Sequence, residues 1–216
     1  MTTLRLERER RFAAAGVYPV ITPEFCGGRD PLWVARELVT AGAQVLQLRV
    51  KSGPDRDFLT LALRFRELTA AAGCLLIVND RADLARLCEA DGVHAGQDDL
   101  PPDALRRLLP DAIIGASTHN RDELLAAQEH DLSTLNLGPI YATATKMNPM
   151  APLGLDTLRE LAPLIRVPFS VMGGIKERNL PELRDAGARL VAMVTELTQA
   201  GHPGEVLARM LTVMRG

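Results

Sequence analysis

Short runs of Val, Ile and Leu alternate along the chain with longer stretches in which apolar residues recur every three or four positions. Leu59 and Leu63 are one such pair, and Leu180 and Leu183 are another. This spacing predicts amphipathic helices, whereas short continuous apolar runs are typical of strands buried on both faces. The runs predicted as strands are Val17–Thr22, Gln44–Arg49, Leu75–Asn79, Val93–Ala95, Ile113–Ala116, Thr134–Gly138, Phe169–Met172 and Leu190–Val194. The helices predicted between and after them cover about 31–41, 55–72, 81–90, 102–109, 120–130, 155–164, 177–186 and 203–214.

Eight strand–helix pairs favour an α/β fold, a closed (β/α)₈ TIM barrel, over an open sheet. An open dinucleotide-binding sheet would need a GxGxxG turn after its first strand, but the chain reads Ile21-Thr22-Pro23 there. Such barrels run from about 200 residues upwards, so residues 1–216 are predicted to form a single domain with short loops. Within residues 1–16, Leu4–Ala15 is expected to form an extra helix that covers the bottom of the barrel.

Composition narrows the class of protein. The chain is 47% hydrophobic and 24% charged, as in ordinary globular proteins, and its net charge is −2. No long basic run occurs and aromatic residues make up only 4%, which argues against nucleic acid as a partner. No apolar run approaches the roughly 18 residues of a membrane span, and Met1–Arg11 lacks the apolar core of a signal peptide. We therefore expect a cytoplasmic protein, a monomer or small homo-oligomer, with free structural cysteines at Cys26, Cys74 and Cys88.

The chemistry of such a barrel collects where its strands end. Gln47, Arg49 and Lys51 alternate along the end of the second strand, so their side chains share one side of it. An amide and two cations on one side suit a polyanion such as a diphosphate, because arginine offers a planar fork and lysine a point charge. A solvated strand end is the equally simple alternative.

Carboxylates follow the next two strands. Asn79-Asp80 ends the third strand, and Asp99 comes shortly after the fourth. Asp80 and Asp99 thus lie at neighbouring strand ends, where two carboxylates, diphosphate oxygens and water would form a Mg²⁺ site. The alternatives are a helix cap at Asn79-Asp80 and a turn at Asp98-Asp99. His94 is expected to be a packed, hydrogen-bonded residue rather than a metal ligand.

Hydroxyl groups follow the fifth and sixth strands. Ser117 and His119 are near neighbours, but no acid in the sequence orients the histidine, so a hydrolase triad has little support. The longest loop follows the sixth strand and carries Thr143, Thr145 and Lys146, which are suitable phosphate donors. A long loop over the barrel mouth is either a functional lid or a surface excursion.

The last two strands end in Gly173-Gly174 and Val194-Thr195. The usual phosphate site of this fold uses these two loops, with backbone amides directed at the anion; a tight glycine turn is the alternative. The sequence therefore predicts two anion subsites at one mouth and an enzyme for phosphorylated substrates.

These motifs resemble those of the thiamine-phosphate synthase family over nearly the whole chain, from about Val17 to Leu211. The matching segments are Gln47-Leu48-Arg49-Val50-Lys51, Val78-Asn79-Asp80, His94-Ala95-Gly96-Gln97-Asp98-Asp99, Gly115-Ala116-Ser117, Gly138-Pro139-Ile140-Tyr141, Thr143-Ala144-Thr145-Lys146 with Gly154, and Gly173-Gly174-Ile175. The family joins 4-amino-5-hydroxymethyl-2-methylpyrimidine diphosphate to 4-methyl-5-(2-hydroxyethyl)thiazole phosphate. The products are thiamine phosphate and diphosphate, and the step belongs to thiamine biosynthesis.

The resemblance also implies roles for single residues. The pyrimidine diphosphate would be held by Gln47, Arg49, Lys51, Asn79, Ser117 and Lys146, of which Arg49, Lys51, Ser117 and Lys146 would be catalytic. Mg²⁺ would be held by Asp80 and Asp99. The thiazole phosphate would be held by Thr143, Thr145, Gly174, Val194 and Thr195.

The family's reaction is thought to be dissociative: diphosphate leaves, a pyrimidinylmethyl cation forms, and the thiazole nitrogen captures it. That chemistry needs stabilisation of the leaving group and positioning, not a nucleophilic side chain. The chain departs from the family pattern at Ala142, where proline is usual, at Val171-Met172, where smaller residues are common, and at Thr195, where serine is usual. A thiazole tautomerase that uses a histidine at the position of His119 shares the fold and is one alternative; a non-catalytic phosphate-binding barrel is another.

Overall fold

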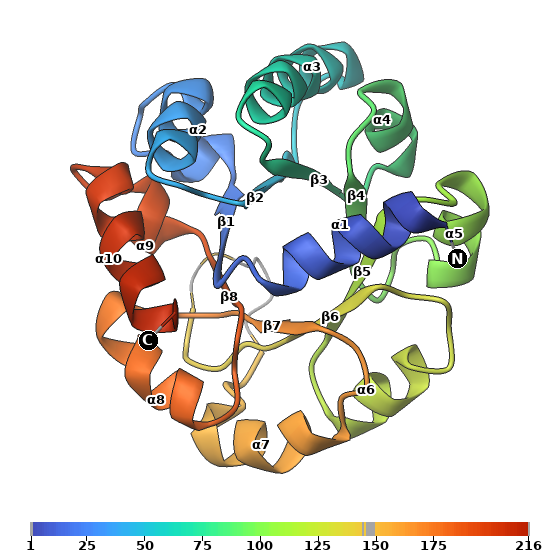
Figure 1. Cartoon of the computed structure of the whole chain (residues 1–216), viewed down its shortest axis with the longest axis vertical. Coiled ribbons are helices and arrows are strands. Elements are labelled where there is room, and N and C mark those ends of the chain that lie inside the picture. Colours follow the sequence, from blue (N-terminus) through green and yellow to red (C-terminus); the bar gives the residue numbers. More distant parts are fainter. Residues whose placement is uncertain (1, 144, 146–149, 216) are drawn as a thin grey trace.

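Eight parallel strands close into a barrel in sequential order, each paired with its neighbours along the chain, and β8 pairs with β1. The computed structural model describes residues 2–143, 145 and 150–215. Figure 1 shows the helices as a ring around the strands. The predicted barrel is confirmed. The strands are β1 Val17–Ile21, β2 Val45–Leu48, β3 Leu75–Asn79, β4 Gly92–Ala95, β5 Ile113–Thr118, β6 Thr134–Leu137, β7 Phe169–Val171 and β8 Val191–Met193.

The helices follow the predicted amphipathic stretches, with ends shifted by a few residues. Local chemistry sets several starts: Asp30 accepts a hydrogen bond from the Leu32 amide (2.9 Å), and Asn120 accepts one from the Glu123 amide (2.9 Å). The helices are α1 Thr3–Ala13, α2 Pro31–Thr40, α3 Asp55–Ala71, α4 Ala82–Leu87, α5 Pro102–Leu108, α6 Arg121–Ala127, α7 Gly154–Leu161, α8 Leu180–Asp185, α9 Thr195–Thr198 and α10 Pro203–Arg215. Single 3₁₀ turns lie at Pro23–Phe25, Ala162–Leu164 and Glu177–Asn179.

Helix α1 lies across the end of the barrel at which the strands begin, as expected (Figure 1). Two arginines attach it there. Arg5 forms a two-pronged ion pair with Asp131, which lies just before β6 (3.0 and 2.6 Å), and Arg8 contacts Asp91, just before β4 (3.0 Å). Phe12 packs edge-on against Tyr18 inside the barrel, with ring centres 5.1 Å apart. The bottom of the barrel is therefore covered, and the opposite end, where the strands finish, is left for the site.

The interior of the barrel becomes more polar towards the mouth. Its lower part is an apolar cluster that includes Tyr18, Leu75 and Ile113. Higher up, buried polar side chains pair with one another across strands, as in the bond from Asn136 Nδ2 to Ser170 Oγ (2.7 Å). Because an unpaired buried polar group costs about 1–3 kcal/mol, such pairing is expected wherever no ligand binds.

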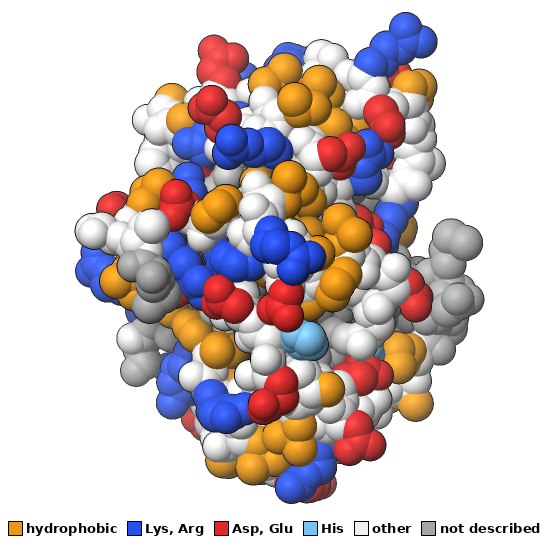
Figure 2. Space-filling model, turned by 90° about the vertical axis from the view of Figure 1, so that its right-hand side faces the viewer, with side chains coloured by type: hydrophobic (Ala, Val, Ile, Leu, Met, Phe, Trp, Pro, Cys, Tyr) orange, Lys and Arg blue, Asp and Glu red, His pale blue; other side chains and the backbone are white. Residues whose placement is uncertain are grey.

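The cysteines agree with the sequence analysis. Cys26, Cys74 and Cys88 are buried and free, and burial raises the pKa of the Cys26 thiol to about 11. Within the described residues, no helix has both the length and the apolar character needed to cross a membrane. Figure 2 shows one side of the molecule, on which acidic and basic side chains are interspersed instead of gathering into a patch of one sign.

Candidate active site

A large cavity of about 860 Å³ opens at the mouth of the barrel. It is lined by residues from the ends of β1 to β5 and from the loop after β6. Seven of the predicted site residues line it together: Arg49, Lys51, Asn79, Asp80, Asp99, Ser117 and Thr145. Because the parallel strands all end at this mouth, residues from positions 49 to 145 meet in one cavity.

Arg49 brings to the cavity a positive charge that no described acidic side chain pairs with. Burial lowers the pKa of its guanidinium, while the charges of Asp80 and Glu24 oppose that change. Among the described residues, the structure gives this guanidinium neither an ion-pair nor a hydrogen-bond partner. A half-buried, unpaired cation is costly, and an anionic ligand would relieve that cost.

Asn79 and Asp80 face the cavity and do not cap a helix. Only 6% of Asn79 is exposed, and its Nδ2 has no hydrogen-bond partner among the described residues. Helix α4 begins two residues after Asp80 and has no side-chain cap at its first turn. Asp80 itself adopts φ 61°, a left-handed conformation that is uncommon for residues other than glycine. Such strain is typical of functional sites.

Two carboxylates and one ammonium group lie together on one side of the cavity. Lys51 Nζ forms an ion pair with Asp80 Oδ2. Burial and the adjacent Asp99 carboxyl raise the pKa of Asp80, and Lys51 opposes this effect. The amide of Gly96 donates to Asp99 Oδ2 (2.7 Å), which orients that carboxylate. Lys51 pairs with only one of these two acids among the described residues, which leaves negative charge suited to a hard cation.

Ser117 is held by a histidine on the neighbouring strand. His94 Nε2 lies 2.9 Å from Ser117 Oγ. Gly115 makes room for this contact, because a Cβ at that position would lie 2.6 Å from His94 Nδ1. His94 is therefore hydrogen-bonded, as the sequence analysis expected, and it fixes the hydroxyl at the wall of the cavity.

The sequence analysis missed two features of the cavity wall, the acid that orients His119 and the buried hydroxyl of Thr22. His119 does have an orienting acid: Glu123 Oε2 lies 2.8 Å from its Nδ1 and also accepts from its backbone amide (2.9 Å). The four-residue spacing at the start of a helix is a signal that could have revealed this pair. Thr22 is 2% exposed and its hydroxyl has no partner among the described residues; a single threonine at the end of a strand carries no such signal.

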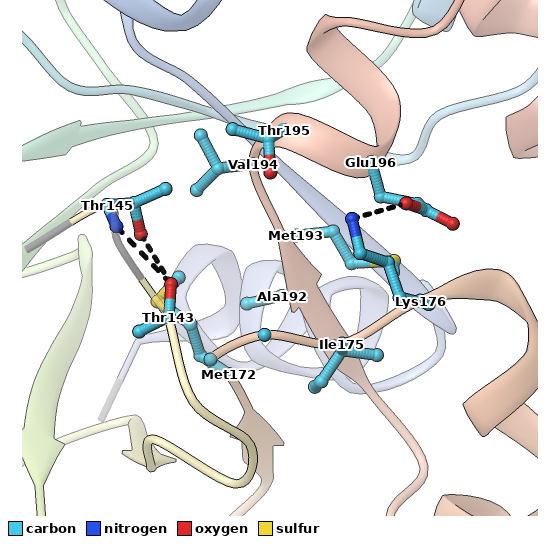
Figure 3. A pocket seen from close by; sticks show the side chains of 12 residues that line it. Thr143, Thr145, Met172, Ile175, Lys176, Ala192, Met193, Val194, Thr195 and Glu196 are labelled. Atoms are coloured by element: carbon cyan, nitrogen blue, oxygen red, sulfur yellow. Dashed lines mark hydrogen bonds and ion pairs between the residues drawn. The ribbon is translucent and has the colours of Figure 1, made fainter. Parts of the chain in front are cut away.

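A second, much smaller cavity of about 40 Å³ adjoins the first (Figure 3). Every residue predicted for the thiazole phosphate lines it, namely Thr143, Thr145, Gly174, Val194 and Thr195, together with Lys176 and Glu196. Thr143 Oγ1 and Thr145 Oγ1 are 3.0 Å apart. Thr145 lines both cavities, so the two predicted subsites are contiguous.

Backbone geometry explains why glycine occupies positions 173 and 174, independently of any phosphate that binds there. Both have positive φ, 105° and 62°. The loop after β6 lies against them: the Tyr141 amide donates to Gly173 O (2.9 Å), and a Cβ on Gly174 would lie 2.9 Å from Tyr141 Cβ. Glycine here lets the loop that carries the two threonines approach the end of β7.

Two predicted residues stand apart from this picture. Gln47 is only 2% exposed, and its Nε2 donates to the Tyr18 hydroxyl (2.6 Å) below the cavity. Its role towards the pyrimidine diphosphate remains a prediction. Lys146 lies outside the described residues.

Comparisons with known proteins agree with this geometry. The thiamine monophosphate synthase family model matches residues 17–197. The chain is 42% identical to the thiamine-phosphate synthase of Pelotomaculum thermopropionicum over 187 residues, 86% of each chain. It is 40% identical to that of Caldicellulosiruptor bescii over 205 residues, 94% of each. The thiamine phosphate pyrophosphorylase from Pyrococcus furiosus superposes with a TM-score of 0.86 at 26% identity, covering 95% of this chain and 98% of that one. The family model and these relatives show that the chain belongs to the thiamine monophosphate synthase family.

Proposed function

We propose that this family member is a magnesium-dependent transferase that joins 4-amino-5-hydroxymethyl-2-methylpyrimidine diphosphate to 4-methyl-5-(2-hydroxyethyl)thiazole phosphate. The observation that carries the proposal is the pair of cavities that share Thr145. The large one has cations and carboxylates for a diphosphate and room for rings, whereas the small one suits a single phosphate group. A reaction between two phosphorylated molecules needs two such subsites side by side. We expect the protein to act in the cytoplasm, as a monomer or small homo-oligomer.

The residues of the large cavity suit a reaction in which diphosphate leaves. As the bond from the pyrimidine methylene carbon to oxygen breaks, negative charge grows on the diphosphate. Arg49 would take up that charge through its planar fork, and Lys51 and the amide of Asn79 would donate to other oxygens. Ser117, held by His94, would donate its hydroxyl proton in a hydrogen bond. The thiazole nitrogen then forms the new bond to the methylene carbon, with its phosphate anchored in the small cavity.

Asp80 and Asp99 fit the proposed Mg²⁺. Among the described residues, no group of three or more His, Cys, Asp or Glu side chains could hold a metal, so the chain offers two carboxylates at most. This is the usual protein share at a Mg²⁺ site, because phosphate oxygens and water complete the coordination. When bound, Mg²⁺ would neutralise charge on the diphosphate.

The test is product formation by the purified protein. With both substrates and Mg²⁺, we expect thiamine phosphate and one equivalent of diphosphate, measured by chromatography and a diphosphate assay. A second reaction with the thiazole phosphate tautomer alone separates the synthase from an isomerase centred on His119. Isomerisation without condensation would overturn the proposal, as would binding of both substrates without any product.

A further inference from the structure

Lys176 is a cation on the wall of the small cavity that none of the predicted phosphate contacts includes. Lysine occurs only three times in the sequence, at Lys51, Lys146 and Lys176, whereas the other basic residues are all arginine. Lys51 lines the large cavity and Lys176 lines the small one. Most ion pairs among the described residues are formed by arginine. The lysine at position 176 therefore needs an explanation from its own surroundings.

An acid holds Lys176 in place. Its Nζ lies 2.9 Å from Glu196 Oε2, with the lysine side chain 41% and the glutamate side chain 24% exposed. The other oxygen, Glu196 Oε1, accepts from the Glu177 amide (3.0 Å). In Figure 3 this pair lies across the end of β8 from Thr143 and Thr145. Glu196 is thus fixed by two donors, and it fixes the ammonium in turn.

The charges around the small cavity indicate what Lys176 could bind. A phosphate monoester carries about −1.5 to −2 charge at pH 7, and the other polar groups of the small cavity are neutral hydroxyls and backbone amides. Among the described residues that line this cavity, Glu196 would be the only charged one without Lys176, and its carboxylate would repel a phosphate. An ammonium group has three donors, and Glu196 is its one partner among the described residues. Two donors remain for a ligand, and the ammonium cancels the repulsion that the Glu196 carboxylate would exert on a phosphate.

We propose that Lys176, positioned by Glu196, binds the phosphate group of the second substrate and selects for phosphorylated over unphosphorylated thiazole. This inference rests on the proposed function. It adds one residue to the small subsite and gives its acidic neighbour a positioning role.

The first variant removes the charge and keeps the length of the side chain. We expect Lys176→Met to raise KM for the thiazole phosphate roughly ten- to a hundredfold, with KM for the pyrimidine diphosphate changed less than about threefold. Arg209→Met is the matched control. Arg209 pairs with Glu177 on the same side of the barrel (2.9 Å) but lines neither cavity, so both KM values should stay as in the wild type.

A double variant separates phosphate binding from a purely structural ion pair. If Lys176 binds phosphate, Lys176→Met combined with Glu196→Gln keeps a high KM for the thiazole phosphate. Glu196→Gln alone then raises that KM by a smaller factor than Lys176→Met does, because the ammonium remains but is held less firmly. If Lys176 only neutralises Glu196, the double variant recovers the wild-type KM, and the proposal is wrong.

A binding measurement keeps this inference distinguishable from the proposed function. Inorganic phosphate is titrated into wild type, Lys176→Met and Arg209→Met and followed by ³¹P NMR line width. We expect weaker binding in the Lys176 variant only. Equal phosphate binding in all three proteins overturns the inference even if the enzyme makes thiamine phosphate. Weaker binding in that variant alone upholds it even if the proposed condensation fails.

Discussion

Asn79 shows at the scale of one residue how a binding site can cost stability. Its buried Nδ2 lacks a partner among the described residues, whereas the amide of Asn136, equally buried, donates to Ser170 (2.7 Å). A buried donor without a partner costs about 1–3 kcal/mol. The protein accepts this cost in the absence of substrate if a diphosphate oxygen accepts the bond in its presence.

Replacing each asparagine by leucine, which has a similar shape, tests this account. We expect Asn79→Leu to leave the melting temperature unchanged or raise it by a few degrees and to raise KM for the pyrimidine diphosphate about tenfold or more. Asn136→Leu, the matched control, should lower the melting temperature because Ser170 loses its partner. Calorimetry and steady-state kinetics measure both effects. A large loss of stability in Asn79→Leu would show that its amide has a structural role.

At the scale of an element, helix α1 depends on ion pairs at the closed end of the barrel. The hydrogen bond from Arg5 lowers the pKa of the Asp131 carboxyl, and burial raises it by less. The pKa of Asp131 therefore lies below its ordinary value of 3.8. A carboxyl whose pKa is lower in the folded state stabilises the fold above its unfolded pKa. That contribution is lost as the pH falls through the folded value.

We therefore expect Asp131→Asn to lower the free energy of unfolding by about 1 kcal/mol at pH 7. The difference between variant and wild type should shrink as the pH falls from about 5 towards 3 and below. Urea denaturation at several pH values measures it. Glu129→Gln is the control, since its partner Arg166 is exposed and its loss should change little. A difference that persists undiminished at the lowest pH would contradict the assigned ion pair.

Elements and site residues differ in how far the sequence predicts them. The strands and main helices follow the hydrophobic pattern because each strand of a covered barrel is buried on both faces. The four-residue helix α9 and the 3₁₀ turn Pro23–Phe25 are too short to show a period, and they were missed, whereas the other two 3₁₀ turns fall within predicted helices. Residues at strand ends, such as Arg49 and Asp99, could be grouped because parallel strands all finish at one mouth. The ion pair between Lys176 and Glu196 joins the turn after β7 to helix α9, 20 positions along the chain, and no local pattern marks it.

At the scale of the whole molecule, the barrel separates two tasks. The end where the strands begin is covered by α1 and carries the ion pairs that hold that helix. The end where they finish collects a half-buried Arg49, an unpaired amide at Asn79 and two adjoining carboxylates around one cavity. These features are unfavourable for the empty protein and would be relieved by a bound magnesium diphosphate. We therefore propose that this mouth is a magnesium-dependent site for a diphosphate leaving group.

The most direct test measures the rate of thiamine phosphate formation against Mg²⁺ concentration in wild type, Asp99→Ala and Asp98→Ala. Asp98 also lines the cavity but has no assigned role with the metal, so it is the matched control. We expect the wild type and Asp98→Ala to depend on Mg²⁺ alike. Asp99→Ala should remain folded, lose most activity and respond to Mg²⁺ only weakly. An Asp99→Ala enzyme with the wild-type dependence on Mg²⁺ would contradict the account.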